Sequence, residues 1–599
     1  MKYGIAVVVA LVAEYLIGIY WANIPFYWPA FLVHLLILFF AMFCVVGIAD
    51  AIQNNSSGYE DKNGFRGILI LGAASVITLV LILVANVGQS FQTLSLHELG
   101  NVKIVENPIE VADTNHIRVI PMESAEQIGN QVLGSGNLGA LYELNHYEIQ
   151  RVRGTLYWVA PLEFRGWFAW RRAEFISPGY VMVNAEDPKA EPKLVTGYKM
   201  RYTWGAWFGS NFSRLVYFRN MSFGQYEPTF EVDESGKPWY VISMVRPSVG
   251  FTGEKLEKVV ILDPETGETQ DYKIGKTPEW ADRIFPEALA EDYTDWWGSY
   301  IHGFWNAHFG NKDVQVLTTT EVGSGEHIER NRDVFLVYNS QTGHPVWISG
   351  ITSPGKDLSM TGYMTTDSIT GEMTFYRDPG YGNEQAAINA VESASEVSIQ
   401  KNYHAAQAIF YNIYGTRVWI VPVLSNVHII EKVAIVYAKD TRHVAVGDSK
   451  EDALERYKDL LTELKAGGGV PTQSSSLTTW QGKVTRIQAV ALDGKAHFYL
   501  MIDTVPNKIL LITPAVSSEV LVTEKGDKVN VTCYDTLEDE VPVKTFDNLA
   551  IDLAKSVPQQ KYEVAKVQEK QRTREEILQQ KQELQKKMDD LKQQELDSQ

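Results

Sequence analysis

The chain has 599 residues, enough for about two to four domains, and 45% of them are hydrophobic. Its formal net charge of −19 argues against a body that holds nucleic acid on a broad basic surface. Its two cysteines, Cys44 and Cys533, fall in unrelated segments, which excludes a disulfide framework and a cysteine-based metal site.

Three apolar runs occupy residues 3–20, 29–48 and 68–87. Each is about long enough to cross a hydrocarbon core of ~30 Å as a helix. The first run lacks a small-x-small cleavage pattern at its end, so an uncleaved anchor is favoured over a signal peptide. We therefore predict a membrane anchor of three transmembrane helices at residues 1–90. An interfacial aromatic belt is expected between the first two helices, at Trp21, Phe26, Tyr27 and Trp28.

Basic residues predict the orientation of this anchor. Lys2, Lys62 and Arg66 share one face of the membrane, and the first basic residue after the third run is Lys103. The positive-inside rule places the first face in the cytoplasm. The expected localisation is the cytoplasmic membrane, with the large body extracytoplasmic.

Two ionisable residues, Glu14 and His34, lie inside the first two runs. Such groups are costly in a bilayer and often belong to a proton or ion path. The alternative is a hydrogen bond between the two helices, or a Glu14 close enough to the membrane interface to stay hydrated. Two isolated groups on three helices favour this alternative over a path.

Residues 91–466 form the expected body, in which one pattern recurs about four times. A glycine turn enters a β-rich run with a tryptophan three or four residues later, and a second β-like run follows about twenty residues on. We expect each pair to form a hairpin, with the tryptophan in an equivalent core position. The tryptophans are Trp158, Trp239, Trp347 and Trp419, and the second runs are residues 180–184, 259–263, 362–367 and 432–437.

The turns and helices of this body carry a family resemblance. The turns at Asp263–Glu268 and Asp367–Glu372 share Asp-x-x-Thr-Gly-Glu, and Asn339–Gly343 is close to it. Helices are expected at residues 125–133, 383–395 and 450–466. Helix, hairpin and turn together resemble the PepSY family, and the whole segment resembles a class of uncharacterised large bacterial membrane proteins. The resemblance implies small α/β modules outside bacterial membranes that regulate proteases or mediate contacts and carry no catalytic residues.

A tryptophan-rich segment at residues 286–311 predicts one amphipathic helix. Its histidines, His302 and His308, are six residues apart and cannot share a helical face, which disfavours a two-histidine metal site. The aromatic side chains are expected to fill the core of a β structure, and a ligand platform is the alternative. They are Trp296, Trp297, Tyr300 and Trp305.

Glycine and serine make residues 467–477 a linker. Five strands are expected in residues 478–555, and the opening Gly482-x-Val484-x-x-Ile487 resembles an OB-fold barrel. The mixed charge of this segment favours an assembly or spacer role over nucleic-acid binding. Residues 556–599 predict a C-terminal helix whose narrow seam, Ile577, Leu584 and Leu591, is compatible with a coiled coil.

Known catalytic and nucleotide-binding motifs are missing from the sequence. We therefore name no catalytic, cofactor-binding or metal residues and no cofactor, and an enzyme is less expected than a non-enzyme. The expected fold is a membrane-anchored α+β protein. The expected function is a structural or interaction protein of the cell envelope that forms a homo-oligomer and contacts the membrane and other envelope proteins. The alternative is an envelope hydrolase or carbohydrate-binding protein that uses the tryptophan-rich segment near residues 296–308.

Overall fold

The computed structural model describes residues 2–57, 62–106, 109, 111–135, 138–322, 329–332, 334–339, 342–355, 358–400, 402–466, 477–492, 495–512, 514, 516–534 and 540–551. The chain divides into two compact units, and the second begins at Leu477.

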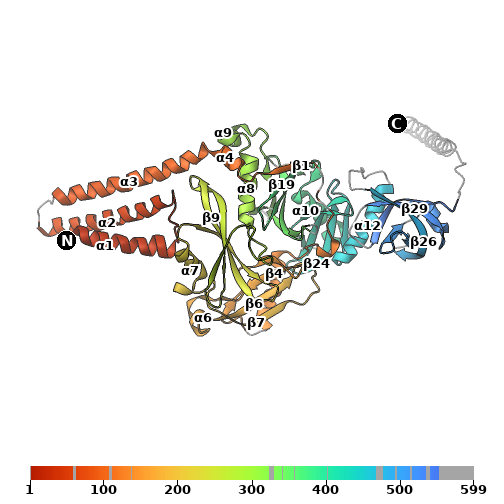
Figure 1. The fold of residues 1–599 in the computed structure, drawn as a ribbon, viewed down its shortest axis with the longest axis horizontal. Helices are drawn as coiled ribbons and strands as arrows, with labels where there is room; N and C mark the ends of the chain where they lie inside the picture. The colour runs from red at the N-terminus through yellow and green to blue at the C-terminus, as the bar shows by residue number, and fades with distance from the viewer. Residues whose placement is uncertain are drawn as a thin grey trace, which may run out of the picture. The chain divides into compact units, whose positions relative to one another are not determined.

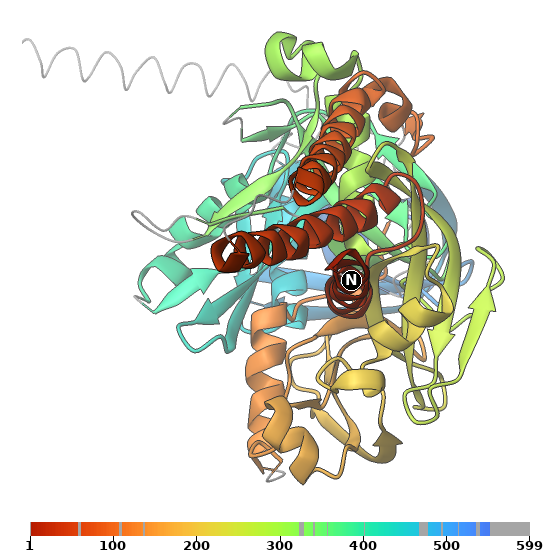
Figure 2. The same cartoon turned by 90° about the vertical axis from the view of Figure 1, so that its left-hand side faces the viewer.

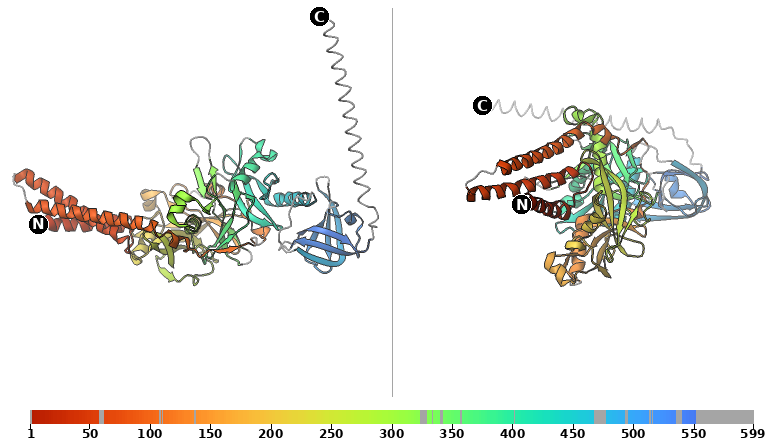
Figure 3. Two further views of the ribbon diagram at one scale, coloured as in Figure 1. Left: turned by 90° about the horizontal axis from the view of Figure 1, so that it is seen from above. Right: turned by 60° about the vertical axis from the view of Figure 1, so that its left-hand side comes forward.

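Three helices at the start of the first unit are long and apolar enough to cross a membrane, as predicted. α1 (Lys2–Glu14) continues into the π-helix η1 (Tyr15–Trp21), and α2 (Phe31–Ser57) and α3 (Lys62–Ser90) follow. The candidate spans are Gly4–Trp21, Phe31–Ile52 and Phe65–Ser90. They lie together on one side of the sheets of the first unit (Figures 1 and 3).

The rest of the first unit is a mixture of sheets and helices. Two sheets are antiparallel meanders, in the orders β3-β4-β6-β7 and β8-β9-β10-β11. A third has the order β1-β19-β18-β16-β12 with β15 also on β16, and a fourth has the order β21-β23-β24-β25 with β22 on β23. The strands are β1 (Lys103–Val105), β3 (Glu148–Val152), β4 (Thr155–Pro161), β6 (Ser177–Asn184), β7 (Lys193–Met200), β8 (Gly224–Val232), β9 (Pro238–Val249), β10 (Thr252–Leu262), β11 (Thr269–Tyr272), β12 (Val316–Leu317), β15 (Phe335–Tyr338), β16 (Pro345–Thr352), β18 (Gly362–Asp367), β19 (Met373–Tyr376), β21 (Tyr403–Ala405), β22 (Ile409–Ile413), β23 (Thr416–Ser425), β24 (Ile430–Tyr437) and β25 (Val444–Gly447).

Helices precede or connect these sheets, and short strand pairs complete the unit. The helices are α4 (Thr93–His97), α5 (Met122–Ser135), α6 (Gly166–Arg172), α7 (Phe212–Arg219), α8 (Glu287–Ser299), α9 (Gly303–Trp305), α10 (Glu384–Ser393), α11 (Ser395–Ser398) and α12 (Lys450–Ala466), and the short strands are β2 (Tyr142–Glu143), β5 (Glu163–Phe164), β13 (Thr319–Val322), β14 (Glu329–Arg332), β17 (Ser359–Met360) and β20 (Tyr381–Gly382). The helices predicted at residues 125–133, 383–395 and 450–466 correspond to α5, α10 and α12.

The four predicted hairpins are present. Each tryptophan-bearing strand pairs antiparallel with the strand expected to return, as β4·β6, β9·β10, β16·β18 and β23·β24. The two Asp-x-x-Thr-Gly-Glu turns have the same hydrogen bonds. In both, the aspartate carboxylate accepts the N–H groups two and three residues on, and the glycine N–H donates to the aspartate carbonyl.

Three of the four tryptophans are equivalent. Trp158, Trp347 and Trp419 are buried, and each indole N–H donates at 2.8 Å to the carbonyl two residues before a helix. The accepting carbonyls belong to Ile120, Phe285 and Gly382, ahead of α5, α8 and α10. The prediction is wrong for Trp239. This side chain is only half-buried, because its indole N–H turns back to Asp233 in the β8–β9 turn and its ring stacks on Trp280.

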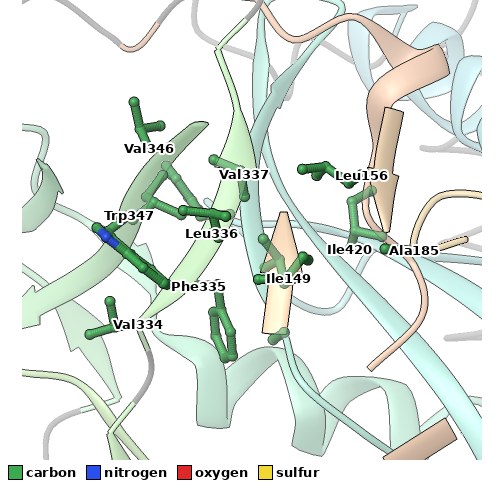
Figure 4. Close-up of a cluster of buried hydrophobic side chains, with 14 of the residues drawn as sticks. Ile149, Leu156, Ala185, Val334, Phe335, Leu336, Val337, Val346, Trp347 and Ile420 are labelled. Atoms are coloured by element: carbon green, nitrogen blue, oxygen red, sulfur yellow. The ribbon is translucent and has the colours of Figure 1, made fainter. Parts of the chain in front are cut away.

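Modules distant in sequence share one hydrophobic core. Leu156 and Ile149 of the first sheet, Leu336 of the third and Ile420 of the fourth belong to a single buried cluster. Figure 4 shows these side chains converging from three sheets. A separate cluster, which includes Phe212, lies between the first two sheets and α7.

The tryptophan-rich segment is not one helix, which corrects the prediction for residues 286–311. α8 ends at Ser299, α9 begins at Gly303 and the π-helix η4 (Asn306–Gly310) follows. Gly303 has φ 79°, in the left-handed region that most residues avoid, so the helix cannot continue through it.

The described residues of the second unit form five strands, where the sequence predicts five. β26 (Leu477–Leu492), β27 (Lys495–Ile502), β28 (Ile509–Ile512), β29 (Lys528–Tyr534) and β30 (Glu540–Asn548) form a closed barrel in the order β26-β27-β28-β30-β29. Neither Cys533, which is buried in the barrel, nor Cys44 forms a disulfide. Except for Leu477, the expected linker lies outside the described residues, and so does the expected helix at residues 556–599.

Candidate functional site: a cavity with two buried arginines

The site begins with a short motif that occurs twice. Arg118 lies two residues before the carbonyl that accepts the Trp158 indole, and Arg283 lies two residues before the one that accepts the Trp347 indole. In both copies a proline follows and a helix starts, which gives Arg-x-(Ile/Phe)-Pro. Proline suits the first turn of a helix, where its missing N–H has no partner to lose.

Each arginine lies over the tryptophan of its own module. The guanidinium carbon of Arg118 is 4.8 Å from the centre of the Trp158 ring, and that of Arg283 is 5.0 Å from the centre of the Trp347 ring. A cation over an indole face is attracted by the ring quadrupole, more strongly when water is excluded. The same tryptophan therefore fixes both the helix start and the position of the arginine.

Both guanidinium groups border one cavity of about 810 Å³ in the first unit. This volume is in the range of small-molecule sites. Apolar side chains such as Phe335 and Leu336 form part of the wall. The titratable side chains in the wall are Glu123, Tyr147, Glu148, Glu227, Glu287, Glu291, His404 and His428.

The two arginines differ in their partners. Arg283 forms ion pairs with Glu148 and, at 3.9 Å, with Glu287. Arg118 is 3% exposed, and within the described residues its guanidinium donates to neutral acceptors, the Leu336 carbonyl at 3.4 Å and the Gln407 amide oxygen at 3.0 Å. Its Nε, like that of Arg283, has no hydrogen-bond partner. In the described part of the chain no carboxylate forms an ion pair with Arg118, and Glu287 and Glu123 act on its charge only from a longer distance.

Burial lowers the pKa of Arg118 and that of Arg283 to about 10, so both remain charged at neutral pH. Burial also raises the pKa of Glu287, against the opposing effect of the two arginines. The pKa of Glu227 rises to about 7, first because the carboxyl is buried and then because Glu287, Glu291 and Asp292 are close. A cationic group and a carboxyl that can hold a proton near neutrality thus border the same cavity.

No residue of this cavity was predicted from the sequence to belong to a site. The signal was present, since Arg-x-(Ile/Phe)-Pro stands before two helices. It was hidden because the two arginines are 165 positions apart in the chain and only packing brings them together.

The tryptophan-rich segment divides into a buried and an exposed part. Trp296 and Trp297 are buried, as expected for core packing, whereas Trp305 is 64% exposed. His302 pairs with Asp313 at 2.9 Å, and the His308 ring is hydrogen-bonded to the Phe304 carbonyl. Within the described ranges, no group of three or more His, Cys, Asp and Glu residues is placed to hold a metal ion.

Glu14 and His34 form the hydrogen bond that the sequence favoured. His34 Nδ1 contacts Glu14 Oε1, and its Nε2 lies 3.1 Å from the Ile24 carbonyl. Both side chains are buried, and the Phe26 ring stacks on the His34 ring at 4.0 Å. The pair links α1 to α2.

Comparisons with known proteins add little. No family model matches the chain, and no curated protein matches it. Among solved structures, a point mutant of the Synechocystis apocarotenoid oxygenase is similar at 10% identity with a TM-score of 0.15. That match covers 51% of this chain and 62% of that chain. An ACO/RPE65 chimera has the same identity, coverage and TM-score. Likeness at this level carries no argument about fold or function.

Proposed function

We propose that this protein is a membrane-anchored structural and interaction protein of the cell envelope that assembles with copies of itself. The supporting observation is that its body is fastened to the anchor at two places. Tyr217 of α7 donates to the Ile24 carbonyl at 2.6 Å, and Phe26 N–H donates to the Met221 carbonyl at 2.6 Å. Near the end of the third helix, a Cβ added at Gly250 in the β9–β10 turn would lie 3.1 Å from the Ala85 carbonyl, so this turn packs on α3.

A body fastened in this way has one orientation above the membrane. Copies confined to two dimensions meet at a raised effective concentration and present the same faces to one another. Repeated contacts of that kind give closed, symmetric assemblies. The proposal includes an extracytoplasmic body, PepSY-like modules, an OB-like second unit and a C-terminal helix that contributes to assembly.

The test is the mass of the full chain extracted in mild detergent. Native mass spectrometry should give multiples of the 67.4 kDa protomer. Deletion of the residues after Lys561 should loosen the oligomer without unfolding the body. A full-length protein that remains monomeric at high concentration contradicts the proposal.

A second candidate function rests on Arg118. A buried charge without an ion pair is costly, and such charges are kept where a ligand completes them. We infer that the cavity receives an anionic group of a small ligand or of a partner protein beside Arg118. Arg283 already forms ion pairs with Glu148 and Glu287, so it serves as the matched control.

The test compares Arg118→Met with Arg283→Met in thermal unfolding, with succinate and inorganic phosphate as probes. The wild type should be stabilised by at least one probe, because ligands that bind only the folded state raise its stability. Arg118→Met should be at least as stable as the wild type without a probe, and neither probe should stabilise it further. Arg283→Met should lose up to about 3–5 kcal/mol, since the partly buried Glu148 is left without its cation. A destabilised Arg118→Met, or no response of the wild type to either probe, contradicts the inference.

The tryptophan-rich segment gives less support to a hydrolase or carbohydrate-binding role. Trp296 and Trp297 are buried, so a sugar would meet only Trp305 and its neighbours. That role remains a proposal for Trp305 alone.

A further inference from the structure

Two patches of exposed, mostly aromatic side chains have no role in the proposed assembly. The α9 patch consists of Phe91, Leu94, Trp305 and Phe309, and the α6 patch consists of Phe168, Trp207 and Phe208. Phe309 and Phe168 are 77% and 78% exposed. Exposed apolar clusters of this kind mark interaction surfaces.

The α9 patch adjoins the end of the third span. That span ends at Ser90, and Phe91 and Leu94 follow it directly. α9 packs on α4, so closely that a Cβ added at Gly303 would lie 3.8 Å from the Leu94 side chain. The Trp305 and Phe309 rings stack with their centres 5.7 Å apart, which makes one continuous aromatic surface.

The α6 patch adjoins the end of the first span, which is Trp21. Arg214 of α7 joins the two, because its guanidinium donates to the Tyr20 carbonyl at 3.0 Å and to the Phe208 carbonyl at 2.7 Å. The same guanidinium lies 4.1 Å from the centre of the Tyr20 ring. Phe208 is therefore held at the level where the first helix ends. Trp207 and Phe208 contact Trp167, which neighbours Phe168 on α6.

Both patches therefore lie at one membrane surface. Because the chain crosses three times, the ends of the first and third spans are on the same face of the bilayer. Viewed along the spans toward the body, α9 and α6 lie on opposite sides of the three helices (Figure 2). Tryptophan and phenylalanine rings at such positions prefer the boundary between headgroups and acyl chains.

We propose that the α9 and α6 patches insert into the interfacial layer of the membrane that the three helices span, so that the body rests on lipid at two points beside its anchor. Arg171 and Arg172 follow Phe168 on α6 and are exposed, which suits contact with anionic headgroups. The proposal rests on the membrane anchor of the proposed function. It also assigns the exposed rings of the tryptophan-rich segment to lipid.

Spin labels at single cysteines test the depth of each patch in the full chain, reconstituted into vesicles of phosphatidylcholine and phosphatidylglycerol. Labels replace Phe309 and Phe168 in a background of Cys44→Ala and Cys533→Ser. Two positions serve as controls, of which Ile399 matches Phe309 and Phe168 in exposure. Val80 lies in the third span and is 48% exposed, and Ile399 follows α11 and is 74% exposed. Oxygen enters lipid and a nickel chelate remains in water, so their relative relaxation effects report depth.

The labels at Phe309→Cys, Phe168→Cys and Val80→Cys should be relaxed more by oxygen than by the nickel chelate. The label at Ile399→Cys should be relaxed more by the nickel chelate. An aqueous signature at Phe309 or Phe168, with Val80 still in lipid, overturns the proposal and leaves the anchor standing. An aqueous signature at Val80 as well overturns the anchor itself, so the two failures are distinct.

Intrinsic fluorescence gives a second readout without labels. Brominated lipid chains quench indoles at the interface, so the wild type should lose more emission than Trp305→Phe in the same vesicles. Equal fractional quenching of the two proteins contradicts insertion of the α9 patch.

Discussion

Single buried carboxyl groups should make the stability of the body depend on pH. Glu163 is buried, where its carboxyl accepts the Gly205 N–H at 2.6 Å and the Tyr240 hydroxyl at 3.2 Å. Burial raises its pKa to about 7, above the ordinary value of 4.5. The folded protein therefore keeps this proton between about pH 4.5 and 7 where the unfolded chain has lost it, and stability from this group falls as pH rises through that window.

Glu163→Gln should remove this dependence. A glutamine accepts the Gly205 N–H and donates to Tyr240, whose hydroxyl oxygen can also accept, so the site stays satisfied. In detergent, the unfolding temperature of the variant should fall less between pH 5 and pH 8 than that of the wild type. Parallel curves for the two proteins would show that Glu163 titrates normally.

The core tryptophans should differ in their contribution to stability. Trp419→Ala removes a fully buried ring and a hydrogen bond to the Gly382 carbonyl, so it should cost about 3–5 kcal/mol of unfolding free energy. Trp239→Ala should cost clearly less, because its ring is half-buried. Denaturant unfolding of both variants measures the difference, and equal losses would contradict the distinction between them.

At the scale of the element, the hairpin turns depend on glycines with positive φ. Gly371 and Gly343 both have φ 72° and close turns of the same pattern. A Cβ at Gly371 would lie 2.6 Å from the Phe285 ring, whereas a Cβ at Gly343 would meet nothing within 4 Å. Alanine substitutions at the two positions therefore distinguish the cost of backbone strain alone from that of strain combined with a steric clash.

Gly343→Ala should cost about 1–2 kcal/mol, the strain of a left-handed residue with a side chain. Gly371→Ala should cost more, because Phe285 must also move, and Phe285 holds the carbonyl that accepts the Trp347 indole. Urea unfolding of both variants provides the comparison. A smaller loss of unfolding free energy for Gly371→Ala than for Gly343→Ala would show that the Phe285 ring moves aside at no cost.

At the scale of the whole molecule, the orientation of the body decides which partners it meets. The positions of Lys2, Lys62 and Arg66 predict an extracytoplasmic body. Protease added outside intact spheroplasts should therefore digest the chain beyond residue ~90 while the anchor survives. Complete protection, with digestion after the membrane is opened, would reverse the orientation.

Much of the architecture could be predicted because short sequence patterns indicate its elements. Apolar run length identified the three spans, alternation with a glycine turn identified the four hairpins, and the Asp-x-x-Thr-Gly-Glu pattern identified two turns with the expected hydrogen bonds. The boundary of α12 was also predicted to the residue. These features depend on interactions between neighbours in the sequence, so the sequence alone determines them.

The site and the break in the tryptophan-rich segment were decided by tertiary structure. Arg118 and Arg283 come together only when the first and third sheets share a core, and the Trp239 ring stacks on Trp280, which lies outside its hairpin. Helical periodicity over residues 286–311 could not show that the chain bends at Gly303 against Leu94, two hundred residues away. Contacts between distant segments follow from how whole surfaces fit, and no local pattern contains that information.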